Sequence, residues 1–305
     1  MTIHSSNEWD PLRAVIVGSA TGANWPDHDP VFAQESQHTT WFDTAPPSGP
    51  VDSKIIDQAN QDLARLEYIL HNLDIKVMRP RNTDFASTGG MYNYCPRDRL
   101  LIADDLIIDV AMMYPCRDQE IEYLRHCLGD AEIITMPRDQ GMVLDAANIC
   151  RLGDDWLYLV SRSGNRAALR WLQDLLPHKR IHACDFYAGT HIDSTIVPLR
   201  EGTVMLNASR VNDNNLPPVL KNWQKIWITE CVPRDFHVYP YASAWIGLNV
   251  LSVDPKTVLV DDIQTGIINT LRAHGFEVIT VPMTQSRTLG GGLHCTTLDL
   301  WRQHD

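Results

Sequence analysis

The feature that most constrains the fold is an order of elements, strand–strand–helix–strand, that recurs along the chain without any repeat of the sequence itself. Short apolar runs occur in pairs, and the turns between the paired runs fall near residues 104, 153, 201 and 254. Each of these turns contains Asp or Gly, which favour tight hairpins. A spacing of about 50 residues is typical of a modular array whose units bury their apolar faces against one another. The pattern therefore predicts an α/β fold built from ββαβ units.

Four complete units are predicted in this way. Each has two apolar strands, then a helical segment, then a third strand. The predicted elements are 100–103, 106–110, 118–128 and 132–136; 148–152, 156–160, 166–176 and 180–184; 194–199, 203–207, 218–223 and 225–229; and 248–253, 257–260, 265–274 and 277–281.

A fifth unit is incomplete at its start. A strand at 13–18 and a closing strand at 75–80 flank a long amphipathic helix at 52–72, whose apolar side chains recur every three or four residues. The missing first strand can come from the C-terminal segment around 294–300. Five units then close into a ring, which removes open sheet edges and brings the C-terminal segment beside a central channel.

Residues 25–49 are rich in Pro, Asp, Thr and Ser and show no periodicity. This composition predicts a long surface loop, and such loops are lids, binding loops or segments without a function. No low-complexity tract and no clear linker interrupts the rest of the chain. We therefore expect a single domain over residues 1–305.

The formal net charge of −12 argues against nucleic acids and anionic membranes as partners and is compatible with a cationic small substrate. No apolar run approaches the about 20 residues of a membrane span. The seven cysteines are scattered and form no Cys-x-x-Cys pair, so neither a disulfide framework nor a zinc site is expected. Residues 1–10 have the features of neither a signal peptide nor a transit peptide. These observations predict a cytoplasmic protein without a metal or cofactor.

A candidate nucleophile follows three consecutive glycines in the segment Leu289-Gly290-Gly291-Gly292-Leu293-His294-Cys295. Glycine lets a backbone approach a ligand closely or adopt positive φ, so the Cys295 thiol is placed for attack on a ligand. A cysteine nucleophile needs a base and a carboxylate that orients the base. Candidates for both are found in His191-Ile192-Asp193-Ser194-Thr195 and Leu144-Asp145-Ala146-Ala147-Asn148.

Each candidate also has a purely structural interpretation. Cys295 can be a small buried hydrophobe, and Asp145 can cap a helix or an Asx turn. Asp98 can cap the turn before the strand at Leu100, and Arg210 can be a surface arginine. No single candidate distinguishes a structural role from a catalytic or binding role. Taken together, the residues favour an active site.

With these segments the chain resembles the arginine amidinotransferases, which include glycine amidinotransferase and its inosamine-phosphate relatives. The resemblance rests on Asn7-Glu8-Trp9-Asp10-Pro11-Leu12, Cys95-Pro96-Arg97-Asp98, Asp145-Ala146-Ala147-Asn148, His191-Ile192-Asp193-Ser194-Thr195, Leu248-Asn249-Val250-Leu251 and Gly290-Gly291-Gly292-Leu293-His294-Cys295. It implies the five-bladed α/β-propeller of the guanidine-modifying (pentein) superfamily, in agreement with the five predicted units. It also implies arginine and an amine acceptor as small-molecule substrates, no cofactor, and a homodimer.

The resemblance implies a role for each matching residue. Cys295 is expected to attack the guanidinium carbon of arginine and to hold the amidino group while ornithine leaves. His191 is expected to act as general acid and base, oriented by Asp145. The other matching residues are expected to contact the substrate: Asp98 and Asp193 at the guanidinium, Arg210 at the α-carboxylate, and Tyr92 and Ser243 at the pocket wall.

These residue types suit the chemistry. A guanidinium is planar and cationic, and its five N–H donors form a fork that paired carboxylates bind bidentately. Its carbon is a poor electrophile, so the reaction needs a strong nucleophile and a proton for the departing amine. A thiolate beside a protonated His and a cationic substrate would have a lowered pKa.

The chain departs from glycine amidinotransferase near the mouth of the expected site. Ala242 replaces the first of a serine pair, Thr190 stands where that enzyme has Met, and Thr296 replaces an aromatic residue. The segment between Met136 and Asp145 is also shorter. These changes are compatible with arginine as donor and leave the acceptor open, with glycine or another small primary amine expected.

Two alternatives remain open on the sequence alone. One is an arginine deiminase or dihydrolase, in which water attacks the intermediate in place of an amine. The other is a non-catalytic propeller that binds a partner. Such a binding protein would have no reason to keep Cys295, His191 and Asp145 together.

Overall fold

The computed structural model describes residues 2–38, 47–185 and 190–304. Within these ranges the strands form five three-stranded sheets and one two-stranded ribbon. Four of the sheets follow one another along the chain: β5 (Leu100–Ala103), β6 (Leu106–Asp109) and β7 (Ile133–Thr135); β8 (Ile149–Leu152), β9 (Asp155–Leu159) and β10 (Arg180–Cys184); β11 (Ile196–Arg200), β12 (Thr203–Asn207) and β13 (Gln224–Ile228); and β14 (Leu251–Ser252), β15 (Thr257–Asp261) and β16 (Glu277–Val281).

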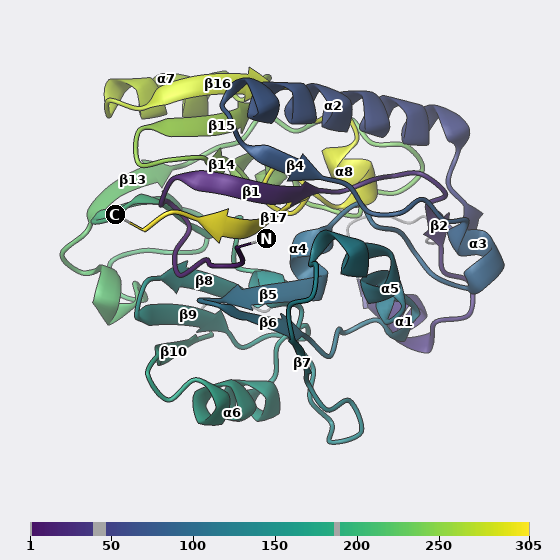
Figure 1. The fold of residues 1–305 in the computed structure, drawn as a ribbon. Helices are drawn as coiled ribbons and strands as arrows, with labels where there is room; N and C mark the ends of the chain where they lie inside the picture. Colours follow the sequence, from purple (N-terminus) through teal and green to yellow (C-terminus); the bar gives the residue numbers. More distant parts are fainter. Residues whose placement is uncertain (1, 39–46, 186–189, 305) are drawn as a thin grey trace.

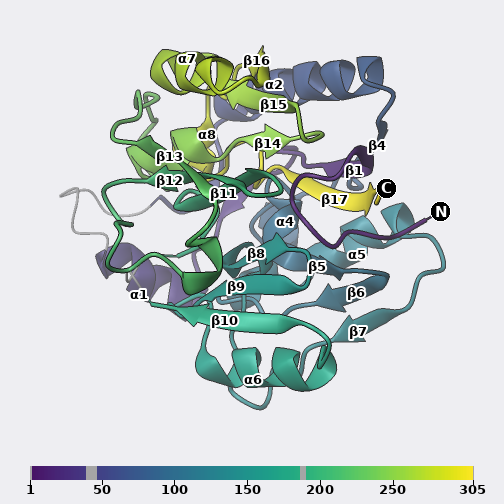
Figure 2. The ribbon, with the colours of Figure 1, turned by 90° about the vertical axis from the view of Figure 1, so that its left-hand side faces the viewer.

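All four sheets share one pairing scheme, in which the middle strand is antiparallel to the first strand and parallel to the third. A parallel pair needs a crossover connection. The helices α6 (Arg166–Leu175) and α7 (Thr265–Ala273) supply it in the second and fourth units. Both helices lie at the periphery of the molecule, with the strands toward its interior (Figures 1 and 2).

The fifth sheet joins the two ends of the chain. The strand β17 (Thr297–Arg302) pairs antiparallel with β1 (Leu12–Val17), which pairs parallel with β4 (Lys76–Met78). The crossover from β1 to β4 is α2 (Ser53–Asn72), which begins where the side chain of Asp52 accepts the backbone N–H of Lys54. The predicted closure by a C-terminal strand is confirmed, and the five three-stranded sheets agree with the predicted α/β-propeller of five units.

Some predicted elements differ in extent. The helix at 118–128 is divided into α5 (Glu120–Leu124) and a 3₁₀ turn, Arg125–Cys127. The helix at 218–223 is reduced to a 3₁₀ turn, Pro218–Leu220. The strand at 248–253 shortens to β14, because the chain before it forms a 3₁₀ helix, Ala244–Leu248.

The predicted structureless loop over 25–49 is wrong for its first half, which contains α1 (Pro30–His38). Asp29 Oδ1 accepts the backbone N–H groups of Val31 and Phe32 at 2.9 and 3.0 Å, and Pro30 occupies the first helical position. The ribbon of β2 (Asn24–Trp25) and β3 (Gly49–Pro50) brings the two ends of this segment together. Residues 39–46 lie outside the described residues.

Short elements connect the sheets and carry the side chains discussed below. They are α3 (Phe85–Thr88), α4 (Pro96–Arg99), α8 (Ser286–Leu289) and the 3₁₀ turns Pro115–Arg117 and Ala146–Asn148. None of the helices in the described ranges is long and apolar enough to cross a membrane.

Candidate active site

The three consecutive glycines lie in the turn between α8 and β17. Gly290 ends α8 with a φ of 81°, a left-handed conformation that other residues rarely adopt. A Cβ on Gly291 would lie 2.5 Å from Sγ of Cys95, and one on Gly292 would lie 2.7 Å from Cβ of Asn249. The close approach expected of these glycines is therefore made to protein side chains, and it fixes the turn that leads to the thiol.

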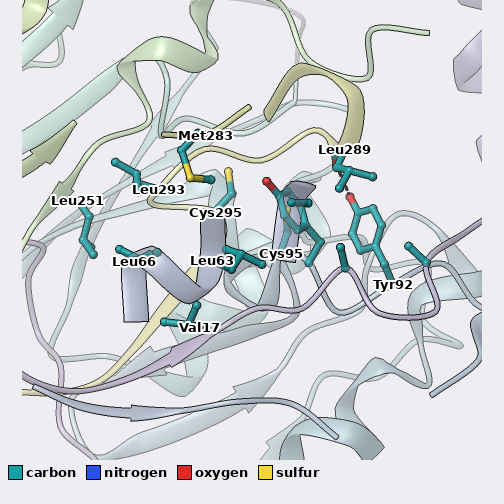
Figure 3. Close-up of a cluster of buried hydrophobic side chains, with 14 of the residues drawn as sticks. Val17, Leu63, Leu66, Tyr92, Cys95, Leu251, Met283, Leu289, Leu293 and Cys295 are labelled. Carbon is teal, nitrogen blue, oxygen red and sulfur yellow. Dashed lines mark hydrogen bonds between the residues drawn. The ribbon is translucent and has the colours of Figure 1, made fainter. Parts of the chain in front are cut away.

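Cys295 is buried, with 2% of its surface exposed. Its backbone N–H donates to Oδ1 of Asn249 at 2.9 Å, and its Sγ lies 3.3 Å from Oδ2 of Asp193. The side chain of Cys95 interacts with it within a cluster of buried apolar residues (Figure 3). The interaction with Cys95, burial and the Asp193 carboxylate together raise the pKa of Cys295 well above its ordinary value, although His191 opposes the shift. Without a bound cation the thiol is therefore protonated at neutral pH.

His191 lies between two buried carboxylates. Its Nε2 is 3.0 Å from Oδ2 of Asp145, and its Nδ1 is 3.7 Å from Oδ1 of Asp98. Burial alone would lower the pKa of His191, but these two carboxylates outweigh burial and raise the pKa well above its ordinary value. The same side chain interacts with Cys295. The arrangement holds a protonated imidazole beside the thiol.

The backbone at His191 has a φ of 58°, which is uncommon for a residue other than glycine. Its N–H donates to Oδ1 of Asn148 at 3.0 Å, and this hydrogen bond helps to hold the conformation. Strained backbone at a titratable residue is frequent in functional sites. Sequence reasoning missed this role of Asn148, although the residue belongs to the segment that contains Asp145.

Asp145 is held through both carboxylate oxygens. Oδ1 accepts the backbone N–H of Met113 at 2.9 Å, and Oδ2 faces His191. The residue precedes the 3₁₀ turn Ala146–Asn148, but its side chain makes no capping hydrogen bond there. The carboxylate is therefore directed to the imidazole and not to the turn that follows it.

Asp98 lies in α4 and is buried. Its Oδ2 accepts from Nη1 of Arg117 at 2.8 Å, whereas Oδ1 has no hydrogen-bond partner among the described residues. Burial raises the pKa of Asp98, while His191 and Arg117 oppose the shift. A buried carboxylate oxygen without a partner is an acceptor available to a ligand.

Arg117, which sequence reasoning did not identify, holds the Asp98 carboxylate in place through Oδ2. Its guanidinium binds both oxygens of Glu120, at 2.7 and 2.9 Å, and stacks over the ring of Tyr92 at 5.0 Å. The only hint in the sequence is the spacing of Arg117 and Glu120, which are three residues apart.

Asp193 provides the third buried carboxylate of the site, and it is the one that contacts the thiol. Its Oδ2 accepts from Nδ1 of His294 at 2.9 Å, in addition to its contact with Cys295. Burial opposes the ionisation of Asp193, but the hydrogen bond and charge of His294 outweigh it and lower the pKa of Asp193 to about 2. Asp193 is therefore a carboxylate at neutral pH.

The remaining expected residues are Tyr92, Arg210 and Ser243, and each has contacts or a position of its own. Tyr92 is buried, and its hydroxyl donates to the backbone oxygen of Leu289 at 3.1 Å (Figure 3). Arg210 Nη1 donates to the hydroxyls of Thr195 and Ser194, at 2.8 and 3.3 Å, in the segment that directly follows Asp193.

Ser243 precedes the 3₁₀ helix Ala244–Leu248. Its neighbour Ala242 donates a backbone hydrogen bond to Arg287 at 3.0 Å, which places this segment beside α8. Tyr241 packs against Gly290, since a Cβ on that glycine would lie 2.1 Å from Cδ1 of the ring.

No group of three or more His, Cys, Asp or Glu side chains suited to hold a metal ion is found in the described part of the chain. The arrangement of Cys295, His191 and the three carboxylates instead offers a nucleophile, a proton donor and acceptors for a cationic ligand.

No protein-family model matches the chain. An inosamine-phosphate amidinotransferase from Streptomyces glaucescens is 39% identical over 332 residues, covering 97% of this chain and 95% of the relative. The solved structure of an inosamine-phosphate amidinotransferase from Streptomyces griseus is 36% identical and has a TM-score of 0.88, covering 99% of this chain and 97% of that chain. The chain belongs to the amidinotransferase family.

More distant relatives carry other names. An L-arginine:L-lysine amidinotransferase from Pseudomonas savastanoi pv. phaseolicola is 29% identical, covering 98% of this chain and 94% of the relative. The mitochondrial glycine amidinotransferase of Xenopus laevis is 28% identical, covering 98% of this chain and 82% of the relative. The N-terminal domain of a cyanobacterial arginine dihydrolase is 12% identical, with a TM-score of 0.69 over 96% of this chain and 98% of that chain, and shares the fold alone.

Proposed function

We propose that this amidinotransferase moves the amidino group of arginine to a primary amine through a covalent intermediate on Cys295. The observation that carries the proposal is the convergence of Cys295 with His191 and with the carboxylates of Asp98, Asp145 and Asp193. A buried cluster with three carboxylates favours a cationic ligand, and a thiol inside that cluster favours attack on the same ligand.

In the first half-reaction the arginine guanidinium binds to Oδ1 of Asp98 and to Asp193. Its positive charge favours loss of the Cys295 proton to solvent, because it offsets the Asp193 carboxylate that disfavours the thiolate. The thiolate attacks the guanidinium carbon, and the bond from this carbon to Nε breaks. His191 gives its proton to Nε, so ornithine leaves as an amine and the amidino group stays on sulfur.

In the second half-reaction an acceptor amine attacks the amidino carbon and the carbon–sulfur bond breaks. The now neutral His191 takes a proton from the amine, and Asp145 keeps the imidazole in the required orientation. Cys295 leaves as the thiolate. One imidazole therefore serves as acid in the first step and as base in the second.

For the acceptor we propose an inosamine phosphate in preference to glycine. The support is the order of the relatives, since the inosamine-phosphate enzyme is 39% identical and the glycine enzyme 28%. The replacement of a serine pair by Ala242 and Ser243 points the same way, because it removes a polar contact that glycine amidinotransferase has at the mouth of the site. Lysine is the third acceptor to test.

The test is to incubate the enzyme with arginine and, separately, an inosamine phosphate, lysine and glycine, and to identify products by mass. We expect ornithine together with the guanidino derivative of the inosamine phosphate, and a much lower kcat/KM with the other two amines. The variant Cys295→Ala controls for background transfer. Equal or faster transfer to glycine would overturn the acceptor. Citrulline or ammonia without a guanidino product would overturn transfer itself and establish the hydrolase alternative.

A further inference from the structure

His294 has no part in the two half-reactions, yet it lies in a chain of buried groups that ends at the nucleophile. Its Nδ1 is 2.9 Å from Oδ2 of Asp193, and its Nε2 is 3.3 Å from Oε2 of Glu8. The same Asp193 oxygen lies 3.3 Å from Sγ of Cys295. The order of contacts is therefore Glu8, His294, Asp193 and Cys295.

Each ring nitrogen of His294 faces a carboxylate oxygen. A neutral imidazole has one donor and one acceptor nitrogen, so it can satisfy only one carboxylate. With a carboxylate oxygen within hydrogen-bond distance of each nitrogen, only the protonated ring donates to both. Burial leaves His294 and its two partners with little water to replace either hydrogen bond.

Glu8 is itself fixed by arginines. Oε1 and Oε2 accept from Nε and Nη2 of Arg151, each at 2.9 Å, and Nη2 also binds Asp299 at 2.8 Å. Burial opposes the ionisation of Glu8, but Arg151 and His294 outweigh it and hold the pKa of Glu8 well below its ordinary value. Glu8 therefore stays charged and anchors the far side of the imidazole.

We propose that protonated His294 is a positioning residue, which holds Asp193 as a carboxylate turned toward the thiol and so prepares it to bind the guanidinium of arginine. This rests on the proposed function, in which Asp193 contacts the donor. Five other charged groups among the described residues face this pair, each from a different segment: Glu8 in the N-terminal segment, Arg97 in α4, Arg151 in β8, Asp299 in β17, and His191 across the site.

The pair formed by Asp193 and His294 also borders a cavity. Glu8, Asp193 and His294 line a small cavity of about 20 Å³, whose other walls are largely apolar side chains such as Ile149 and Val250.

Two substitutions separate the two contacts of the ring. The amide of His294→Asn can occupy the place of Nδ1 and donate to Asp193, but it carries no charge. The amide of His294→Gln can reach toward Glu8 and leaves Asp193 without its donor. His182→Asn is the control, because His182 forms a comparable pair with Asp155, at 2.7 Å, at a partly exposed position in β10.

The experiment measures the Kd of arginine by calorimetry between pH 6 and 9 in the Cys295→Ala background, where no transfer occurs. We expect His294→Gln to weaken binding at least tenfold at pH 6 and less as pH rises, because Asp193 without its cation ionises only at higher pH. The Kd of His294→Asn should lie between those of His294→Gln and the parent, and the Kd of His182→Asn should equal that of the parent. Glu8→Gln, which keeps His294 but removes its anchor, should shift the profile in the same direction as His294→Asn.

A merely structural role for His294 would change the folded fraction and leave the pH dependence of Kd in place. The inference is overturned if both His294 variants have Kd values within twofold of the parent at every pH. If only one His294 variant is soluble, the same result for that variant and for Glu8→Gln overturns it. Absence of arginine binding in the Cys295→Ala parent would instead overturn the proposed donor, and this inference with it.

Discussion

Nε2 of His191 lies 3.0 Å from Oδ2 of Asp145, although the two residues are 46 positions apart in the chain. Asp145 directly precedes the 3₁₀ turn before β8, and His191 stands shortly before β11, so two adjacent units of the propeller each contribute one of them. The contact explains why Asp145 makes no capping hydrogen bond in its own turn. It also makes the charge of His191 depend on a carboxylate that the chain holds rigidly.

The substitution Asp145→Asn removes one of the two carboxylates that raise the pKa of His191. We expect the pKa of His191 to fall and kcat to drop by about 100-fold or more, since general acid–base catalysis contributes at least this factor. The pH dependence of kcat measures both effects, and Asp154→Asn at an exposed turn is the control. An unchanged pH profile with reduced kcat would show that Asp145 acts in some other way.

The raised pKa of His191 also predicts a pH dependence of stability. A histidine whose pKa is higher in the folded state stabilises the fold fully below its unfolded pKa of about 6.5 and loses that contribution as pH rises through the folded value. Each unit between the two values corresponds to about 1.4 kcal/mol.

Urea unfolding of the wild type and His191→Gln at pH 6, 8 and 10 checks this expectation. The stability difference in favour of the wild type should shrink as pH rises. A difference that is constant or grows with pH would contradict the assigned charge state.

Arg117 should matter more for stability than an exposed arginine. The substitution Arg117→Met leaves the buried carboxylates of Asp98 and Glu120 without their cation, and breaking a buried pair costs about 3–5 kcal/mol. Arg125→Met is the matched control, because Arg125 pairs with Glu122 at an exposed position and should cost less than about 1 kcal/mol. Equal losses in urea unfolding would mean that the buried network adds nothing beyond a surface pair.

Gly291 and Gly266 give opposite expectations for the same substitution. A methyl group at Gly291 would meet Sγ of Cys95 at 2.5 Å, so Gly291→Ala should cost about 1–3 kcal/mol and displace the Cys295 turn, with a loss of turnover. A methyl group at Gly266, in α7, meets nothing within 4 Å, so Gly266→Ala should be neutral or stabilise by up to about 1 kcal/mol. Thermal unfolding and kcat of the two variants, measured side by side, decide this point.

The fold could be predicted from the sequence to the extent that apolar periodicity dictated it. The alternation and turns of the hairpins, and the three-to-four spacing of Leu63, Leu66 and Leu70 in α2, are local signals, and the structure confirms them. Residues 30–38 were missed because their helix is specified by the cap at Asp29 and Pro30 and not by an apolar stripe. The capping residues Asp29 and Pro30 were visible in the sequence, but a search for apolar periodicity does not detect them.

The site was less accessible to sequence reasoning. Cys295, His191 and Asp145 stood out because they lie in ordered motifs with small neighbours. Arg117 and the partners of His294 did not stand out, because their roles arise from contacts between distant parts of the chain. Arg117 contacts Asp98, and His294 contacts Glu8, which is 286 positions away from it. Such pairs carry no local spacing that a sequence pattern could show.

The most direct test of the central claim is intact-protein and peptide mass spectrometry after incubation with arginine and no acceptor. The covalent mechanism predicts one amidino group on Cys295, release of one ornithine per adduct, and discharge of the adduct when an acceptor amine is added. Cys295→Ser should form no adduct, and His191→Asn should form it more slowly. An adduct on another cysteine, or steady release of citrulline with no adduct on any residue, would contradict the account.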